Sequence, residues 1–378
     1  MRRSLIAGLA ILFPVVLAAQ GITLPPSGDN QKSTVTQHIG PVVVSIDYSS
    51  PDVHAPNGDD RRGKIWGTDV AHYGFIDEAF GTCTECPWRA GANENTVFTV
   101  SHDVKIEGQT LPAGSYGLAL AVGREGEPWT LIFNKNHTSW GSYFYDPKDD
   151  ALRVSVKPAK SEYHEWLTYE FTDRKPDQAT AALKWEDIQV PWTIKVDDIA
   201  GVYISEMRKE LNSAPGFDWQ NWVAAAQYSL QNKRPNDALE FADAAVHRVF
   251  VATENFQTLN TLAMAQEASG KTAEAQATRE KAINHRTAGP VEIHQYARQL
   301  LNQGKKEEAL RVWELNAKRY PNEWPVNVGL ARGYSANGRY KDALKYAKLA
   351  AAQAPDEGNR KSLEAGIKKL EAGKDMNQ

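Results

Sequence analysis

Apolar and polar residues alternate in short runs along the first half of the chain. In the run GPVVVSIDYSSP, Val42, Val44 and Ile46 share one parity, which is the period-two pattern of a half-buried β-strand. Similar runs follow through residues 95–196, separated by turns that contain Pro or Gly. Because no helical periodicity interrupts them, the pattern predicts an antiparallel β-sandwich or barrel-like domain over residues 35–197.

The pattern changes near residue 197 and becomes helical. Residues 198–216 predict one helix and a linker that contains the phrase NSAPG. Beyond the linker, small residues recur with a period of 34 residues. They are three glycines and six alanines: Gly270, Gly304, Gly338, Ala275, Ala309, Ala343, Ala263, Ala297 and Ala331. Small residues at this period indicate helical hairpins that cross closely and bury their apolar faces by stacking.

This period and these small residues resemble the tetratricopeptide repeat. A weaker unit precedes the others, with Trp222, Ala226, Ala238 and Ala245 in equivalent places. We therefore expect about four hairpins over residues 217–356, forming an all-α solenoid. Residues 357–378 are predicted to form the polar capping helix and tail that such arrays need.

Residues 1–20 have the pattern of a signal peptide: arginines, an apolar run, and then the small pair Ala18–Ala19. The run is short for a bilayer span and contains Pro14, which disfavours the alternative of a permanent membrane anchor. Residues 21–34 are rich in Pro, Ser, Gly and Asn and predict a flexible leader. We expect a periplasmic or secreted protein of a Gram-negative-type envelope, with no stable membrane insertion after cleavage.

The charge balance narrows the class of partner. The chain carries 43 Lys and Arg against 47 Asp and Glu, a formal net charge of −4. Recognition of nucleic acid needs a basic face, and binding to anionic lipid needs a polybasic segment, so this balance supports neither. The expected partner is a protein or peptide.

Several phrases of the β half resemble one exported bacterial family, catalogued as domain of unknown function 2911. They are RRGKIWG, WRAGANENTVFT, LPAGSYGL, WGSYFYDPKDDALRV and WLTYEF, in this order along residues 35–197. The resemblance implies an exported β-rich domain, sometimes followed by tetratricopeptide repeats, and implies no reaction. This chain departs from the family pattern by inserting FIDEAFGTCTECP after Tyr73–Gly74.

The only two cysteines, Cys83 and Cys86, lie on that insertion. Covalent haem attachment needs a histidine at residue 87, which is Pro. A zinc site would need further ligands such as His72 and His102, and a thioredoxin-like site would need a helix N-terminus within a βαβ unit. We favour a structural disulfide in an oxidising compartment, and predict no metal and no cofactor.

The phrase RAGANE offers the best candidate ligand site of the β half. Arg89 provides a bidentate donor fork, and Asn93 and Glu94 provide polar groups beside it. Together with Lys64, Asn134 and His137 they are predicted to line a cleft for a polar ligand. The alternative is that these side chains lock loops at the end of the sandwich.

In the repeats, the residues beside each crossing alanine are predicted to face a concave groove. They are Asn260, Met264, His294, Arg298, Val328 and Arg332. Asn, His and two Arg on one surface suit an acidic or C-terminal peptide. The alternative is that they are solvated side chains on a structural spacer.

No catalytic residue is predicted, because the chain lacks G-x-S-x-G, H-E-x-x-H, the phosphate loop and the dinucleotide glycine fingerprint. The sequence favours a non-enzymatic binding module whose helical repeats serve as a scaffold for a partner. One alternative is a hydrolase or carbohydrate-active enzyme with its site near Arg89–Glu94. A second is a thiol-redox accessory protein that uses Cys83 and Cys86.

Overall fold

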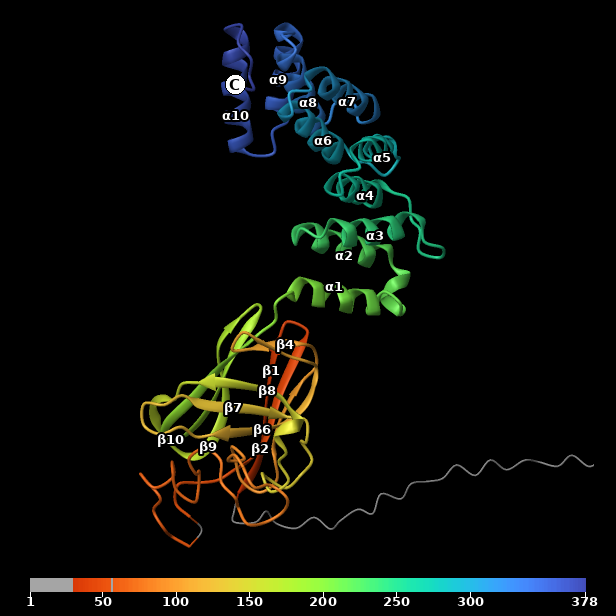
Figure 1. Ribbon diagram of the computed structural model, residues 1–378. Helices are drawn as coiled ribbons and strands as arrows, with labels where there is room; N and C mark the ends of the chain where they lie inside the picture. The colour runs from red at the N-terminus through yellow and green to blue at the C-terminus, as the bar shows by residue number, and fades with distance from the viewer. Residues whose placement is uncertain (1–29, 56) are drawn as a thin grey trace, which may run out of the picture. The chain divides into compact units, whose positions relative to one another are not determined.

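The computed structural model describes residues 30–55 and 57–378, and these form two compact units that divide at residue 199 (Figure 1). The expected signal peptide, and the expected leader up to residue 29, lie outside the described residues.

The first unit is built from two antiparallel sheets. The larger contains β1 (Gln31–Ile39), β2 (Val42–Ser50), β3 (Thr96–Val100), β6 (Gly114–Ala121), β7 (Trp129–Asn134) and β8 (Asp150–Val156), in that order. The smaller contains β5 (Gln109–Leu111), β4 (Val104–Ile106), β10 (Gln178–Lys195) and β9 (Ala159–Lys175), in that order. A 3₁₀ helix, η2 (Pro147–Asp149), precedes β8. The predicted antiparallel β fold is confirmed.

The alternating pattern of the sequence corresponds to alternating burial in the sheets. Val42, Val44 and Ile46 of β2 are fully buried, and the residues between them are half-buried. Phe98 of β3 packs edge-to-face on Phe133 of β7, with ring centroids 5.1 Å apart. Apolar residues of one parity therefore supply the core, as the sequence predicts.

The first strand begins earlier than expected. The sequence predicts a leader that includes residues 31–34, but β1 pairs with β2 along its whole length, from Gln31 opposite Ser50 to Ile39 opposite Val42. The early part of β1 is polar and exposed, so its side chains carry no strand signal. Backbone hydrogen bonds to β2 hold it instead.

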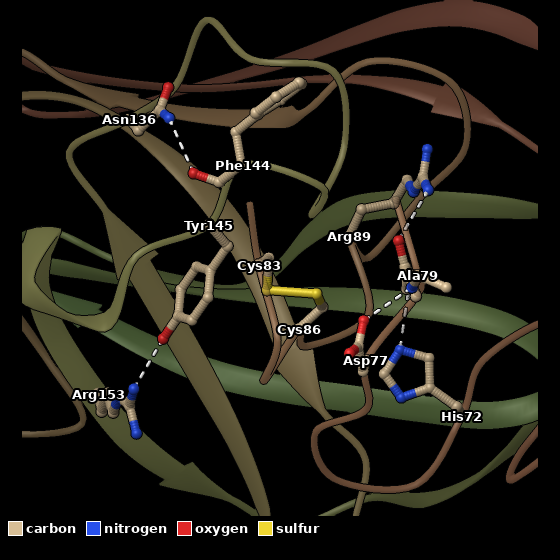
Figure 2. Close-up of a disulfide and its surroundings, with 11 residues drawn as sticks. His72, Asp77, Ala79, Cys83, Cys86, Arg89, Asn136, Phe144, Tyr145 and Arg153 are labelled. Atoms are coloured by element: carbon tan, nitrogen blue, oxygen red, sulfur yellow. Dashed lines mark hydrogen bonds and ion pairs between the residues drawn. A yellow bond between two sulfur atoms is a disulfide. The ribbon is translucent and has the colours of Figure 1, made fainter. Parts of the chain in front are cut away.

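Residues 51–95 join β2 to β3 through isolated bridges and turns, and include the insertion. Ile76 and Cys86 exchange both backbone hydrogen bonds, at 3.1 and 2.7 Å, which closes the insertion into a loop. Cys83 and Cys86 are bonded to each other and buried, and they pack with Ala119, Ala121 and other residues of the larger sheet (Figure 2). The insertion is thus a packed part of the domain.

The second unit is helical. Its helices are α1 (Ile199–Glu210), α2 (Trp219–Gln231), α3 (Pro235–His247), α4 (Phe256–Ala268), α5 (Thr272–Asn284), α6 (Pro290–Asn302), α7 (Lys306–Arg319), α8 (Trp324–Ala336), α9 (Tyr340–Ala352) and α10 (Glu357–Glu371), with the 3₁₀ helix η3 (Ala214–Phe217) after α1. Four hairpins, α2–α3 to α8–α9, are followed by α10 (Figure 1). In the described part of the chain, no helix is both long and apolar enough to cross a membrane.

The small residues of the repeat lie where the helices meet. Ala263, Ala297 and Ala331 are fully buried on α4, α6 and α8, and so are Ala309 and Ala343 on α7 and α9. The first hairpin has a longer spacing because residues 248–255 form an extra loop between α3 and α4. The predicted helical-repeat fold is confirmed.

Replacing both cysteines by alanine is expected to lower the free energy of unfolding of the β unit by about 2 kcal/mol, because the ring that the disulfide closes is small. The unit should remain folded, because the backbone hydrogen bonds between residues 76 and 86 still close the insertion into a loop. Urea denaturation of the variant and of the native protein measures this loss. The reduced native protein is the control. A variant that fails to fold would show that the disulfide holds the domain itself.

Candidate functional site

The loop that carries Arg89 is fixed by buried hydrogen bonds. Trp88 pairs with Leu120 of β6 through two backbone hydrogen bonds of 2.8 and 3.1 Å. The carbonyl of Ala90 accepts from the hydroxyls of Tyr169, at 2.7 Å, and Thr96, at 3.1 Å. Ala90 has a φ of 51°, a left-handed conformation that costs a non-glycine residue about 1–2 kcal/mol. The loop is therefore held in a strained and defined shape.

Arg89 is held from several sides. Its Nη1 donates to the carbonyl of Asn93 at 2.8 Å, and its guanidinium lies 4.9 Å from the ring centroid of Tyr143. Gly141 has a φ of 60°, and a Cβ atom there would lie 2.4 Å from Cζ of Arg89. A side chain at residue 141 would displace the guanidinium, so this glycine gives Arg89 its place.

Glu78 and His72 approach Arg89 although neither belongs to the predicted site. Nη2 of Arg89 lies 3.9 Å from Oε2 of Glu78, and Nε2 of His72 lies 3.9 Å from Oε1 of Glu78. Figure 2 shows His72 and Arg89 on either side of the segment that carries Asp77 and Ala79. Ala79 is also left-handed, with a φ of 55°. Glu78 comes from the insertion, and no sequence motif marks it.

These groups line a cavity of about 330 Å³. Its walls include Arg61, His72, Glu78, Trp88, Arg89, Asn93 and Trp185. Two predicted site residues, Arg89 and Asn93, therefore lie in one cavity. Burial lowers the pKa of His72, and the opposing charge of Glu78 does not offset this effect.

The other predicted residues of the β site lie elsewhere. Glu94 pairs with Lys32 on an exposed edge, and Lys64 is exposed. Asn134 donates to the carbonyl of Asp146 and to Oδ1 of Asp150, which fastens the loop before β8. The ring of His137 contacts the carbonyl of Lys135, at 3.1 Å, within its own loop. None of these four lines the cavity, and for Glu94, Asn134 and His137 the loop-locking alternative describes the structure better.

A second cavity, of about 940 Å³, is lined by Trp66, Trp129, Trp192 and polar residues of the β9–β10 hairpin. Trp66 contacts Trp88, Trp129 and Trp185 at centroid distances of 5.0–6.0 Å. One aromatic cluster therefore reaches both cavities. Within the described residues, no group of three His, Cys, Asp or Glu side chains is arranged to hold a metal ion.

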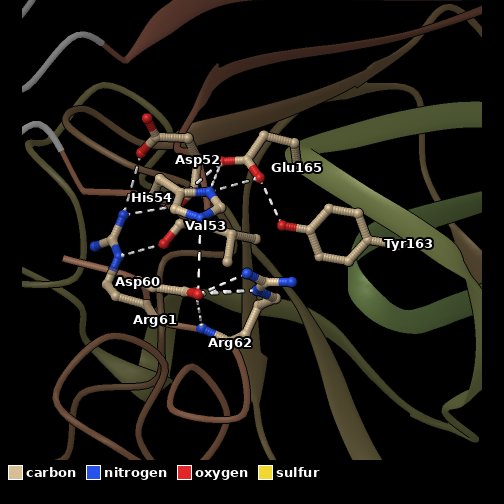
Figure 3. A network of polar contacts seen from close by, with 8 residues as sticks. All are labelled: Asp52, Val53, His54, Asp60, Arg61, Arg62, Tyr163 and Glu165. Carbon is tan, nitrogen blue, oxygen red and sulfur yellow. Dashed lines mark hydrogen bonds and ion pairs between the residues drawn. The ribbon is translucent and has the colours of Figure 1, made fainter. Parts of the chain in front are cut away.

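An exposed polar network holds the segment that carries Arg61 (Figure 3). His54 lies between Glu165, at 2.9 Å, and Asp60, at 3.8 Å. Burial opposes ionisation of Glu165, but hydrogen bonds from Tyr163 and His54 outweigh it and lower the pKa of Glu165 to about 2. Arg61 itself donates to the carbonyl of Asp52 at 2.7 Å. The network fixes one wall of the smaller cavity.

In the helical unit, His294, Arg298, Val328 and Arg332 come together on α6 and α8; with Ser335 we call them the α6–α8 surface. Burial, together with the charges of Arg298 and Arg332, lowers the pKa of His294 to about 4. Nδ1 of His294 accepts a hydrogen bond from Nε1 of Trp313 at 3.2 Å, which requires the neutral ring. Asn260 and Met264 contact each other on α4, one hairpin earlier.

The C-terminal tail, residues 373–378, folds back onto the α6–α8 surface. Ser335 Oγ donates to Asp375 at 2.6 Å and accepts from the backbone N–H of Met376 at 2.9 Å. Nδ2 of Asn377 donates to the carbonyl of Arg332 at 3.0 Å, and Nη1 of Arg332 donates to Oδ1 of Asn377 at 3.3 Å. Met376 is buried against residues of α8 and α10. The sequence predicts a tail here but not its contacts with α8, because its residues have no periodic pattern.

Below about pH 6.5, the helical unit is expected to lose stability. The folded pKa of His294, about 4, lies below its ordinary value of 6.5, so the unfolded state binds more protons between these two values. The loss is on the order of 3 kcal/mol and levels off below pH 4. Melting of His294→Gln between pH 4 and 7, followed by circular dichroism, should show a flatter pH dependence than the native chain. The control is His247→Gln, at an exposed histidine; an equal slope in native and His294→Gln proteins would contradict the assignment.

Comparison with known proteins finds a family model for the β unit and solved structures similar to the helical unit. No protein with a curated description matches the chain. Among solved structures, the C-terminal part of a TPR repeat-containing protein from Cytophaga hutchinsonii has 14% identity and a TM-score of 0.37, covering 46% of this chain and 66% of that one. YrrB, described as a TPR protein with an unusual peptide-binding site, has 15% identity and a TM-score of 0.30, covering 44% and 89%. A thermophilic TPR protein from Thermus thermophilus has 17% identity and a TM-score of 0.30, covering 46% and 91%.

The family resemblance drawn from the sequence phrases is confirmed. Residues 30–194 match the model of a family described as a protein of unknown function (DUF2911). The match covers both sheets of the β unit and the insertion between β2 and β3. The chain thus joins a β domain that is similar to the DUF2911 family to an array of four helical hairpins.

Proposed function

We propose that this protein is an exported binding scaffold whose helical unit holds an extended, acidic segment of a partner protein on the α6–α8 surface. One observation carries the proposal: the chain's own tail, with the sequence Asp375-Met376-Asn377, is bound there through side chains and backbone. The surface accommodates a peptide without forming a helix or strand with it.

The chemistry of the surface selects for acidic residues. Arg332 is half-buried, and burial and the neighbouring charge of Arg298 lower its pKa, while Asp375 acts in the opposite direction. Two guanidinium groups thus repel each other across the surface, and an anion between them relieves the repulsion. Nε of Arg332 is buried without a hydrogen-bond partner among the described residues, which leaves one donor for a ligand. The carboxylate of an aspartate or glutamate of a partner supplies both the anion between the two guanidinium groups and an acceptor for Nε of Arg332.

The apolar contact adds a second requirement. Met376 fills a site formed by α8 and α10, where its Cε approaches the backbone at Gly366. A flexible thioether adapts to such a site with little strain. The preferred partner segment therefore has a carboxylate followed by an unbranched apolar residue.

Export to the envelope is part of the same proposal. Its support is the arginine-led apolar run of residues 1–20 and the disulfide of Cys83 and Cys86, which persists in an oxidising compartment. The two sulfurs are buried and bonded to each other, so neither is an accessible thiolate of the kind that thiol-redox catalysis needs.

The test uses the chain shortened after Gly373 and a fluorescent peptide of residues 371–378. The shortened chain should bind the peptide, measured by anisotropy, and the full chain should bind it at least tenfold more weakly because its own tail competes. Arg298→Glu and Arg332→Glu together should weaken binding at least tenfold, about 1.4 kcal/mol. Arg311→Glu, an exposed arginine on α7, is the matched control and should have no effect.

Equal binding by the double variant and the control would contradict the proposal. Circular dichroism of each protein establishes that the helical unit is folded. Replacing aspartate by asparagine in the peptide should reduce affinity, since the surface is proposed to select the carboxylate.

A further inference from the structure

The smaller cavity of the β unit contains buried polar groups whose hydrogen-bonding capacity is unused. His72 is 8% exposed; the backbone of Tyr73 lies near its ring, but neither ring nitrogen makes a hydrogen bond of good geometry in the described part of the chain. The same holds for Oε2 of Glu78 and Nε1 of Trp185. A buried polar atom without a partner costs about 1–3 kcal/mol, so four in one place need an explanation.

The spacing of these groups indicates what is missing. Both oxygens of the Glu78 carboxylate face a nitrogen at 3.9 Å: Oε1 faces His72, and Oε2 faces Arg89. This distance is too long for a direct hydrogen bond. A single oxygen atom that forms hydrogen bonds of about 2.8 Å with both partners spans such a gap. Two oxygens, one in each gap, would lie side by side along one carboxylate.

Two neighbouring oxygens that each donate to a carboxylate and accept from a nitrogen are the hydroxyl groups of a vicinal diol. Glu78 accepts from both, and Arg89 donates to one of them. One nitrogen of His72 donates to the other hydroxyl. Each hydroxyl then donates one hydrogen bond and accepts one.

The charges around the cavity favour a neutral ligand. Arg61 is paired with Asp52, at 3.2 Å, and Arg89 is balanced by Glu78. No excess positive charge is left for a phosphate or carboxylate group. A polyol matches this balance better than an anion does.

Part of the cavity wall is aromatic. Trp88 and Trp185 line the cavity with indole rings stacked at an interplanar angle of 11°. Aromatic rings pack on the C–H groups of apolar ligand surfaces, while polar groups at the other wall set the orientation. A volume of about 330 Å³ is at the small end of ligand sites, which suits one ring rather than a chain.

We propose that the β unit binds a single neutral sugar ring, free or at the end of a glycan, through two adjacent hydroxyl groups held by Glu78, Arg89 and His72. The site is separate from the peptide surface of the helical unit. The proposal assigns binding and no reaction.

The test is saturation-transfer NMR on the full chain with methyl glycosides of glucose, galactose, mannose and N-acetylglucosamine, with the corresponding disaccharides, and with inorganic phosphate. At least one glycoside should receive saturation, and its analogue lacking one hydroxyl of the bound pair should not. Binding of both a glycoside and its disaccharide would indicate a glycan end. Binding of the glycoside alone would indicate a free sugar.

Glu78→Gln should weaken sugar binding at least tenfold, because it replaces one of the two acceptor oxygens by a donor. The matched control is Glu85→Gln, an exposed glutamate of the same insertion, which should bind within twofold of the native chain. Thermal melting establishes that both variants are folded. The proposal is overturned if no sugar of the panel binds, so that the cavity holds water only, if phosphate binds in preference, or if Glu78→Gln binds as the control does.

Discussion

Both units of this protein depend on apolar faces that no single element can bury by itself. A sheet buries its inner face only against a second layer, and a helical hairpin only against its neighbours. In the β unit, the long β9–β10 hairpin belongs to the second sheet, and the insertion covers Ala119 and Ala121 of the larger one. In the helical unit, α10 follows the hairpin α8–α9, and α10 and Met376 cover its apolar face. The insertion and the tail, which lie outside the regular patterns, thus complete the two cores.

The sequence predicted the parts that follow from periodicity. Crossing helices leave no room for large side chains, so Ala297 and Ala331 recur at a fixed spacing and mark the repeat. The alternation of apolar and polar residues predicted β2, because only alternate side chains of this strand point into the core. The start of β1 was not predicted, because backbone pairing with β2 holds residues 31–34 and their polar side chains show no strand pattern.

The candidate site was predicted only in part, and the reason is geometric. Arg89 and Asn93 were found because they are close in sequence. Glu78 reaches Arg89 because the bridge between Ile76 and Cys86 folds the insertion back, and His72 faces Glu78 from the segment before the insertion. Asn134 has the chemistry of a ligand residue, but its amide is used to fix the loop before β8. Residue type alone does not distinguish a side chain that binds a ligand from one that binds its own loop.

The tail of the helical unit joins two roles that are separate in principle. The end of a repeat array needs a polar cap, and the α6–α8 surface is proposed to recognise a peptide. Residues 373–378 cap the array and at the same time occupy this surface. A segment tethered by a few residues competes at an effective concentration on the order of millimolar. A partner segment must therefore bind tightly enough to displace the tail at that effective concentration. When it binds, it must also replace Met376 in covering α8 and α10. A ligand with a carboxylate but no apolar neighbour would leave that apolar surface in water, so capping by the chain's own tail imposes the specificity that recognition requires.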